Sequence, residues 1–215
     1  MPDYELHQMW STPIIKVRNA DHPRIKPGLV RYCYEQERVA RQQVDSGVAP
    51  NLKAGLYEST LDVFKHVEVP EIQALSQFCM RSVGEVAAQL RAQTRPADPT
   101  GQIAVAIHES WVHITRDRGY HDTHTHPNCS WCGVYGIEQG DSSEMPRNGT
   151  TRFDSPIDTS YMDLGSDAYV TGSMWVCPED GLLVLFPSYL HHSATPYTGT
   201  KDRIVIAFNA RVYRP

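Results

Sequence analysis

The sequence predicts a mainly β fold, an antiparallel sandwich or barrel, with helices in the N-terminal part of the chain. The first hundred residues contain two segments rich in helix-forming residues. The remainder contains short runs of β-branched and aromatic residues, separated by turn residues and without helical patterns between them. The chain has 215 residues. We therefore expect a single domain over 1–215, with a helix-rich part at 1–100 packed on a β core at 101–215.

Two helices are expected in the N-terminal part. The segment 27–45 is rich in helix formers and opens with a proline, which suits a first helical turn. The segment 70–93 has a clearer pattern, because its apolar residues recur at steps of three and four and form one stripe. That stripe consists of Ile72, Leu75, Cys79, Val83, Val86 and Leu90. The residues 94–101 that follow are rich in turn formers and are expected to connect elements of one domain.

Strands are expected after Gly101. The segment 103–115 is rich in β-branched and aromatic residues, and six shorter segments are similar. These are 120–126, 130–138, 168–176, 182–186, 191–197 and 203–212. The stretch 139–165 is rich in Gly, Ser, Asp, Asn and Pro. We expect it to be a long loop with one strand at 150–154, of the kind that covers a site.

The composition argues against several classes of partner. The formal net charge is −5 and no basic block is present, so we expect no nucleic-acid partner. The longest apolar runs have the length of a strand, so we expect no membrane span. The first residues do not have the pattern of a secretory signal, and the five cysteines have irregular spacing. We therefore expect a soluble, cytoplasmic protein with reduced thiols.

Histidines are clustered at two places in the expected β part. The clustered residues among the ten histidines are His108, His113, His121, His124, His126, His191 and His192. Histidine is the commonest metal ligand and the usual general base near neutral pH. Two clusters separated in the sequence are what a metal site assembled from two strands requires.

The segment 121–127 contains a His-x-His pair. Residues two apart lie on the same face of a strand, so Asp122, His124 and His126 share a face at intervals of about 6.6 Å. All three would span about 13 Å of backbone, which is too far for one ion. The strand therefore supplies two ligands, and we expect His192 to be the third, because an antiparallel neighbour would bring it opposite the pair.

Arg203 begins the expected strand 203–212 and places a fixed cation among apolar residues. An arginine in such a position either pairs with a carboxylate or binds an anionic ligand through its bidentate fork. Both interpretations stay open at this point.

A closed structural zinc site is an alternative use of the same segment. His124, His126, Cys129 and Cys132 are the ligand types of such a site. However, the second cysteine lies within an expected strand rather than on a tight knuckle. A zinc site there would also leave the downstream histidine and arginine unexplained.

Taken in order, these motifs resemble a known family. The resemblance rests on the segments 109–113, 124–128, 131–135, 181–192 and 203–209. They contain a His-x-His-Pro element, a Gly-Val-Tyr strand and a Phe-Pro-Ser-x-x-x-His turn. Over about 105–212 the chain resembles the Fe(II)- and 2-oxoglutarate-dependent oxygenases of an uncharacterised bacterial and phage type. This resemblance implies a double-stranded β-helix core, a cupin-like jelly roll with helices packed on one side.

The resemblance also implies a cofactor, a co-substrate and their ligands. It implies Fe(II) bound by His124, His126 and His192, and it implies that Arg203 holds the far carboxylate of 2-oxoglutarate. The implied reaction decarboxylates 2-oxoglutarate with O2 and hydroxylates a C–H bond of a substrate that the sequence does not identify. No catalytic residue beyond the metal ligands is expected, and the loop 139–165 is a candidate lid.

The chain departs from the family pattern at three positions. His126 stands where better-known relatives place a carboxylate, and Asp122 and Asp154 are the acids that could replace it. Val205 stands where relatives often have a serine, and Cys132 also replaces a serine. The fold prediction is unaffected by these changes, whereas the use of 2-oxoglutarate is less firmly implied.

Two other functions therefore stay open. A three-histidine dioxygenase resembling cupins would bind its substrate directly to iron and take up O2 without releasing succinate. A non-catalytic module would be either a zinc-stabilised domain or a jelly roll that binds a sugar or an acid.

Overall fold

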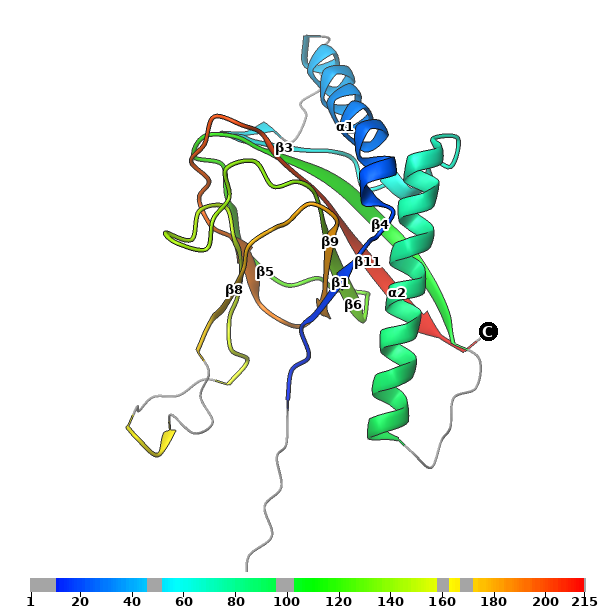
Figure 1. Cartoon of the computed structure of the whole chain (residues 1–215), viewed down its shortest axis with the longest axis vertical. Coiled ribbons are helices and arrows are strands. Elements are labelled where there is room, and N and C mark those ends of the chain that lie inside the picture. The colour runs from blue at the N-terminus through cyan, green and yellow to red at the C-terminus, as the bar shows by residue number, and fades with distance from the viewer. Residues whose placement is uncertain (1–10, 46–51, 96–102, 158–162, 167–171, 215) are drawn as a thin grey trace, which may run out of the picture.

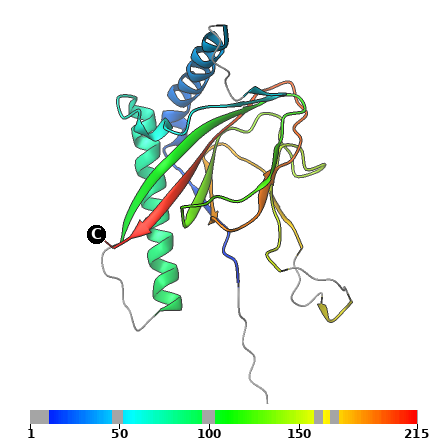
Figure 2. The same cartoon turned by 180° about the vertical axis from the view of Figure 1, so that it is seen from behind.

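A computed structural model shows two antiparallel sheets, with two helices covering the outer face of the larger one (Figures 1 and 2). It describes residues 11–45, 52–95, 103–157, 163–166 and 172–214. The helices and the larger sheet enclose one apolar core, and the two sheets enclose a second. The predicted architecture of a β sandwich with N-terminal helices is confirmed.

The larger sheet has seven strands within the described residues. In spatial order they are β1 (Ile15–Arg18), β9 (Leu182–Pro187), β6 (Trp131–Glu138), β11 (Arg203–Tyr213), β4 (Ala104–Thr115), β3 (Leu56–Glu58) and β2 (Leu52–Lys53). The four strands of the smaller sheet are β5 (His121–His124), β10 (His192–Ala194), β7 (Thr151–Phe153) and β8 (Met174–Val176). From β4 onward the chain passes back and forth between the sheets, which is the topology of a double-stranded β-helix.

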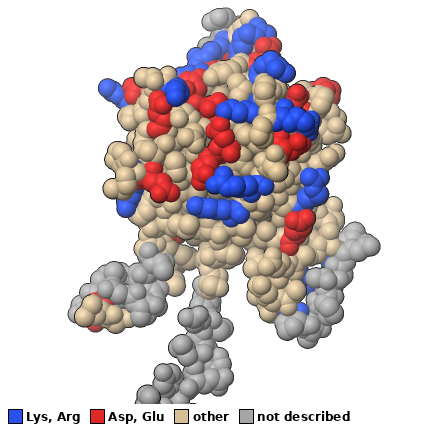
Figure 3. Space-filling model, viewed as in Figure 1, with Lys and Arg blue, Asp and Glu red and all other residues tan. Residues whose placement is uncertain are grey.

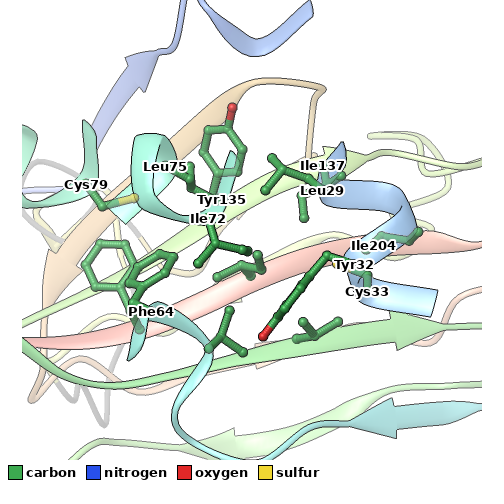
Figure 4. Close-up of a cluster of buried hydrophobic side chains, with 14 of the residues drawn as sticks. Leu29, Tyr32, Cys33, Phe64, Ile72, Leu75, Cys79, Tyr135, Ile137 and Ile204 are labelled. Atoms are coloured by element: carbon green, nitrogen blue, oxygen red, sulfur yellow. The ribbon is translucent and has the colours of Figure 1, made fainter. Parts of the chain in front are cut away.

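Helices α1 (His22–Asp45) and α2 (Pro70–Thr94) pack side by side on the larger sheet, and the short 3-10 helix η1 (Val63–Lys65) lies between them in sequence. The first four residues of the predicted α2 stripe, from Ile72 to Val83, are fully buried, and the last two are half-buried. Figure 4 shows residues of both helices packed against Tyr135, Ile137 and Ile204 of the sheet. The apolar periodicity of α2 therefore predicted its buried face correctly.

Helix α1 begins five residues before the predicted start, and Pro27 lies inside it. The helix begins just after Asp21, whose backbone carbonyl accepts hydrogen bonds from Arg24 and Ile25. Pro23 already occupies the first turn, where a missing N–H is harmless. The prediction took the second proline for the first turn, and this boundary was wrong.

Strands β5 and β10 are shorter than predicted, and a register shift separates their two paired positions, His192 with His124 and Ala194 with His121. Strand β8 covers the end of the predicted strand 168–176, and residues 167–171 lie outside the described ranges. Most of the predicted connector 94–101 also lies outside them. Strands β1, β2 and β3 were not predicted, because each is too short for a period-two pattern to stand out.

Strand β11 separates the two cores. Ile204 and Ile206 face the helices, whereas Arg203, Val205 and Ala207 line a cavity between the sheets. This alternation is the period of two expected of a strand. It places functional side chains on the face that is not needed for packing the helices.

The surface agrees with the balanced composition. On the face shown in Figure 3, acidic and basic side chains are intermixed rather than gathered into a patch of one sign. Neither helix of the described chain has the length and apolarity needed to cross a membrane.

Candidate metal centre

Three histidines meet at one end of the cavity between the sheets. His124 ends β5 and His192 begins β10, and the two residues are direct partners in the antiparallel pairing. His126 follows the end of β5, where its backbone N–H donates to the carbonyl of Ser188 at 3.1 Å. One potential ligand atom from each imidazole lies within 4.8 Å of the other two. The structure thus brings together the three residues that the sequence predicted as ligands.

The backbone fixes the tautomer of two of these imidazoles. His192 Nδ1 lies 2.9 Å from the carbonyl oxygen of Leu190, and His124 Nδ1 lies 2.7 Å from that of Asp122. A carbonyl can only accept, so both rings donate their proton from Nδ1. The lone pair is then on Nε2, the arrangement that is common in metal-binding histidines.

Burial keeps two of the imidazoles neutral. It lowers the pKa of His192 to about 3 and that of His126 to about 4, and the neighbouring His124 lowers both further. A histidine binds a metal only in its neutral form. These two side chains are therefore ready to bind a metal ion at neutral pH.

The imidazole of His126 is held by polar groups that the sequence did not reveal. Asn209 on β11 donates from Nδ2 to Glu109 Oε2 at 2.7 Å, and the same nitrogen lies 3.3 Å from His126 Nδ1. Asn209 itself is buried. An amide nitrogen can only donate, so Asn209 donates to both Glu109 and His126 Nδ1 and bridges the two side chains.

Arg203 lies in the same cavity and is only 2% exposed. Its Nε donates to the carbonyl oxygen of Gly149 at 2.8 Å, and one terminal nitrogen lies 3.5 Å from Thr115 Oγ1. Within the described ranges Arg203 forms no ion pair with a carboxylate. Burial lowers the pKa of Arg203 to about 10, so it remains a cation near neutral pH. The described residues therefore do not support the alternative in which Arg203 forms a structural ion pair with a carboxylate.

The cavity combines the imidazoles and the guanidinium with apolar walls. Its lining residues include Trp111, His124, His126, Thr151, Phe186, His192, Arg203, Val205 and Phe208. The aromatic walls limit the access of water, which strengthens any electrostatic interaction inside. Such a cavity suits a metal ion with an anionic ligand extending from it toward the arginine.

Neither candidate acid joins the three histidines. Asp122 is exposed, and Asp154 pairs with Arg152 at 2.7 Å and accepts a hydrogen bond from Ser173. Among the described side chains, the group around His124 contains imidazoles alone. The departure at position 126 is therefore not compensated by a nearby carboxylate ligand.

The geometry does not favour the structural zinc alternative. Cys129 Sγ and Cys132 Sγ lie 3.8 Å apart, but neither thiol is grouped with the histidines. Cys132 instead donates to Asn209 Oδ1 at 3.3 Å. Burial raises the pKa of both thiols, so they are not thiolates at neutral pH.

The described part of the long loop, 139–157, is fixed rather than free. Asn148 donates to the carbonyls of Asp141 and Thr198, and Arg147 stacks on Trp175 with 3.4 Å between its guanidinium carbon and the ring centroid. The loop also supplies the carbonyl of Gly149 to the buried guanidinium. This part of the predicted lid forms a wall of the site.

A double-stranded β-helix with clustered imidazoles and a buried cation in one cavity has the donor groups of a non-haem metal site beside a site for an anionic ligand. Residues 109–209 match the family model described as "Putative 2OG-Fe(II) oxygenase". The matched segment contains the three histidines and Arg203. No curated protein matches the sequence.

Solved structures of low sequence identity have the same fold. A prolyl hydroxylase from Trichoplax adhaerens, in complex with a hypoxia inducible factor peptide fragment, is 14% identical with a TM-score of 0.54, over 91% of this chain and 83% of that one. A prolyl-4-hydroxylase from Pseudomonas putida is 15% identical with a TM-score of 0.50, over 91% and 92%. HygX from Streptomyces hygroscopicus, with nickel and 2-oxoglutarate bound, is 12% identical with a TM-score of 0.51, over 93% and 83%.

The family match over residues 109–209 and the jelly-roll fold together point to a 2OG-Fe(II) oxygenase. Fe(II), 2-oxoglutarate and O2 are the cofactor and co-substrates of that class. The predicted fold, enzyme class and cofactors are confirmed.

Proposed function

We propose that His124, His126 and His192 bind Fe(II) and that Arg203 binds the far carboxylate of 2-oxoglutarate. The observation that supports this most strongly is the buried guanidinium, which lies in the same cavity as the imidazoles and has no carboxylate partner among the described residues. An unpaired buried cation is unfavourable, so its presence indicates a ligand of opposite charge. A dianion that also reaches the metal meets both requirements.

The charges support a dianionic co-substrate. Three neutral imidazoles leave both positive charges of Fe(II) in place, and Arg203 adds a third. The two carboxylates of 2-oxoglutarate offset two of these three. Glu109, bridged to His126 through Asn209, is a nearby anion that offsets part of the remainder.

The residues of the chain have distinct tasks in the reaction. Bound in this site, Fe(II) supplies the chemistry by which O2 decarboxylates 2-oxoglutarate to succinate and CO2 and places one oxygen atom in a C–H bond of the substrate. Arg203 orients the co-substrate, and Thr115 Oγ1 offers a hydroxyl 3.5 Å from one of the guanidinium nitrogens. Trp111 and Phe186 restrict water at the site.

An anaerobic titration of the purified chain with Fe(II) and 2-oxoglutarate tests this proposal. We expect a weak visible charge-transfer band, which His192→Ala abolishes and which Arg203→Ala shifts to far higher 2-oxoglutarate concentration. Arg152→Ala is the matched control, because Arg152 is half exposed and pairs with Asp154 outside the cavity. Equal 2-oxoglutarate affinity in the wild type and in Arg203→Ala would contradict the assigned role.

The absence of a carboxylate from the described imidazole cluster keeps one rival testable. A three-histidine dioxygenase would consume O2 without forming succinate. Succinate formed in a one-to-one ratio with the O2 consumed supports the proposal, and O2 uptake without succinate favours the rival.

A further inference from the structure

A second group of metal-ligand side chains lies beside the three histidines. We propose that Glu58, His113 and His121 form a separate site for a divalent transition-metal ion such as Zn²⁺. This inference goes beyond the proposed function and does not depend on it, because it rests on other residues.

The strand register brings the three residues together. Glu58 ends β3 and pairs directly with His113 on β4, so the two side chains project from neighbouring strands. His121 begins β5 in the other sheet. Three strands from two sheets therefore fix the positions of the three side chains, as in a site built on a rigid scaffold.

The three ligand atoms lie close enough together for one ion to reach all of them after a small adjustment. Glu58 Oε2 lies 2.7 Å from His113 Nε2 and 3.5 Å from His121 Nε2. All three ligand atoms lie within 4.8 Å of one another. Ligands around a tetrahedral ion with bonds of about 2.0–2.1 Å lie roughly 3.4 Å apart. Small rotations of the rings would therefore suffice to admit an ion.

The donor set suits a borderline divalent ion. Two imidazole nitrogens and one carboxylate oxygen are ligands that Zn²⁺ and Fe²⁺ both accept. Hydrogen bonds from His113 and His121 hold the pKa of Glu58 well below its ordinary value, so the group is a carboxylate. The second site thus contains the anionic ligand that the three-histidine site lacks.

The environment is partly enclosed but reachable. The side chains of Glu58, His113 and His121 are 16%, 12% and 18% exposed. Both imidazoles also line the cavity that contains Arg203. The rings of His121 and His124 lie 4.3 Å apart between centroids, so the two sites are immediate neighbours. An ion in the second site would sit at the wall of the co-substrate cavity.

Metal stoichiometry tests the proposal. Metal-free full-length protein is titrated with Zn²⁺, dialysed and analysed for zinc per folded chain, with folding checked by circular dichroism. We expect two ions in the wild type, one in Glu58→Gln, one in His192→Ala and none in the double variant. Glu35→Gln is the matched control, because Glu35 is exposed and pairs with Arg38, and it should retain two ions.

The outcomes separate this inference from the proposed function. One ion in the wild type that persists in Glu58→Gln and is lost in His192→Ala overturns the second site alone. Loss of an ion in Glu58→Gln but not in His192→Ala supports the second site and contradicts the three-histidine assignment. Should Glu58→Gln fail to fold, anomalous scattering from zinc-soaked wild-type crystals decides: a peak among Glu58, His113 and His121 supports the site, and its absence overturns it.

Discussion

The two faces of strand β11 are equally buried but differ in the partners of their side chains. Ile204 and Ile206 face the helices and contact other apolar residues. Arg203 and Asn209 face the opposite way, and Arg203 has no acidic partner within the described residues. Buried apolar surface stabilises the fold by about 25 cal/mol per Å², whereas an unpaired buried cation destabilises it. We infer that the helix face provides stability, whereas the cavity face is arranged for binding.

The largest expected effect is on the helix face. Ile204→Ala should lower the free energy of unfolding by about 2–5 kcal/mol, because it leaves a cavity in a closely packed core. The affinity of the folded protein for 2-oxoglutarate should not change. Urea denaturation and calorimetric titration measure the two quantities. A loss of 2-oxoglutarate affinity without a loss of stability would contradict the inference that the helix face contributes only to stability.

A substitution at Arg203 should have the opposite effects on stability and on 2-oxoglutarate affinity. Arg203→Met should leave the metal-free protein as stable as the wild type or more stable, because it removes an unpaired buried charge. Its affinity for 2-oxoglutarate should fall about 100-fold, equal to roughly 2.7 kcal/mol. Thermal unfolding with and without Fe(II) and 2-oxoglutarate provides the measurement. A strongly destabilised metal-free variant would show that the arginine is structural.

A charged group on the helix side differs from Arg203, because this buried charge does have partners of opposite charge. Glu37 on α1 accepts hydrogen bonds from Arg116 at 2.7 and 2.8 Å and from Arg41 at 2.6 and 3.0 Å. Burial alone would raise the pKa of Glu37, but these hydrogen bonds outweigh it and lower the pKa below its ordinary value. Glu37→Gln should lower stability at pH 7 by roughly 2 kcal/mol, less than for a fully buried pair because Arg116 is partly exposed.

The pH dependence of this effect has a defined sign. Because the folded-state pKa of Glu37 is lowered, its contribution is complete above the unfolded pKa of about 4.3 and is lost as the pH falls through the folded value. Denaturation curves at pH 7 and pH 3 should therefore show a smaller gap between wild type and Glu37→Gln at the lower pH. A gap that widens in acid would contradict the assigned ion pairs.

The smallest effect concerns support of a metal ligand on the cavity face. Asn209→Ala should weaken Fe(II) binding about 10-fold, because it removes the group that connects Glu109 to His126. Affinity for 2-oxoglutarate at saturating metal should change little. Competition with a metal chelator measures the affinity for Fe(II). An unchanged affinity would show that Asn209 does not support the metal ligand.

The sequence predicted the parts of the fold and site that depend on local patterns. The His-x-His pair was enough to place His124, His126 and His192 near one another, given antiparallel pairing, whereas the place of Arg203 beside them was implied only by the family resemblance. The stripe from Ile72 onward likewise indicated the buried face of α2. In each case the signal lies within one segment or in the simplest pairing of two.

The remaining features depend on contacts that no local pattern encodes. The group of Glu58 with His113 requires the register of β3 on β4, and β3 has only three residues. The connection from Glu109 to His126 requires the pairing of β4 with β11 and the turn after β5. The early start of α1 depended on which of two prolines, Pro23 or Pro27, occupied the first turn.

The proposed metal centre is tested most directly by a crystal structure of the protein grown anaerobically with Fe(II) and 2-oxoglutarate. We predict iron bound by His124, His126 and His192, with the far carboxylate of 2-oxoglutarate on the guanidinium of Arg203. Iron bound elsewhere while these three imidazoles remain without metal, or a co-substrate carboxylate directed away from Arg203, would contradict the account.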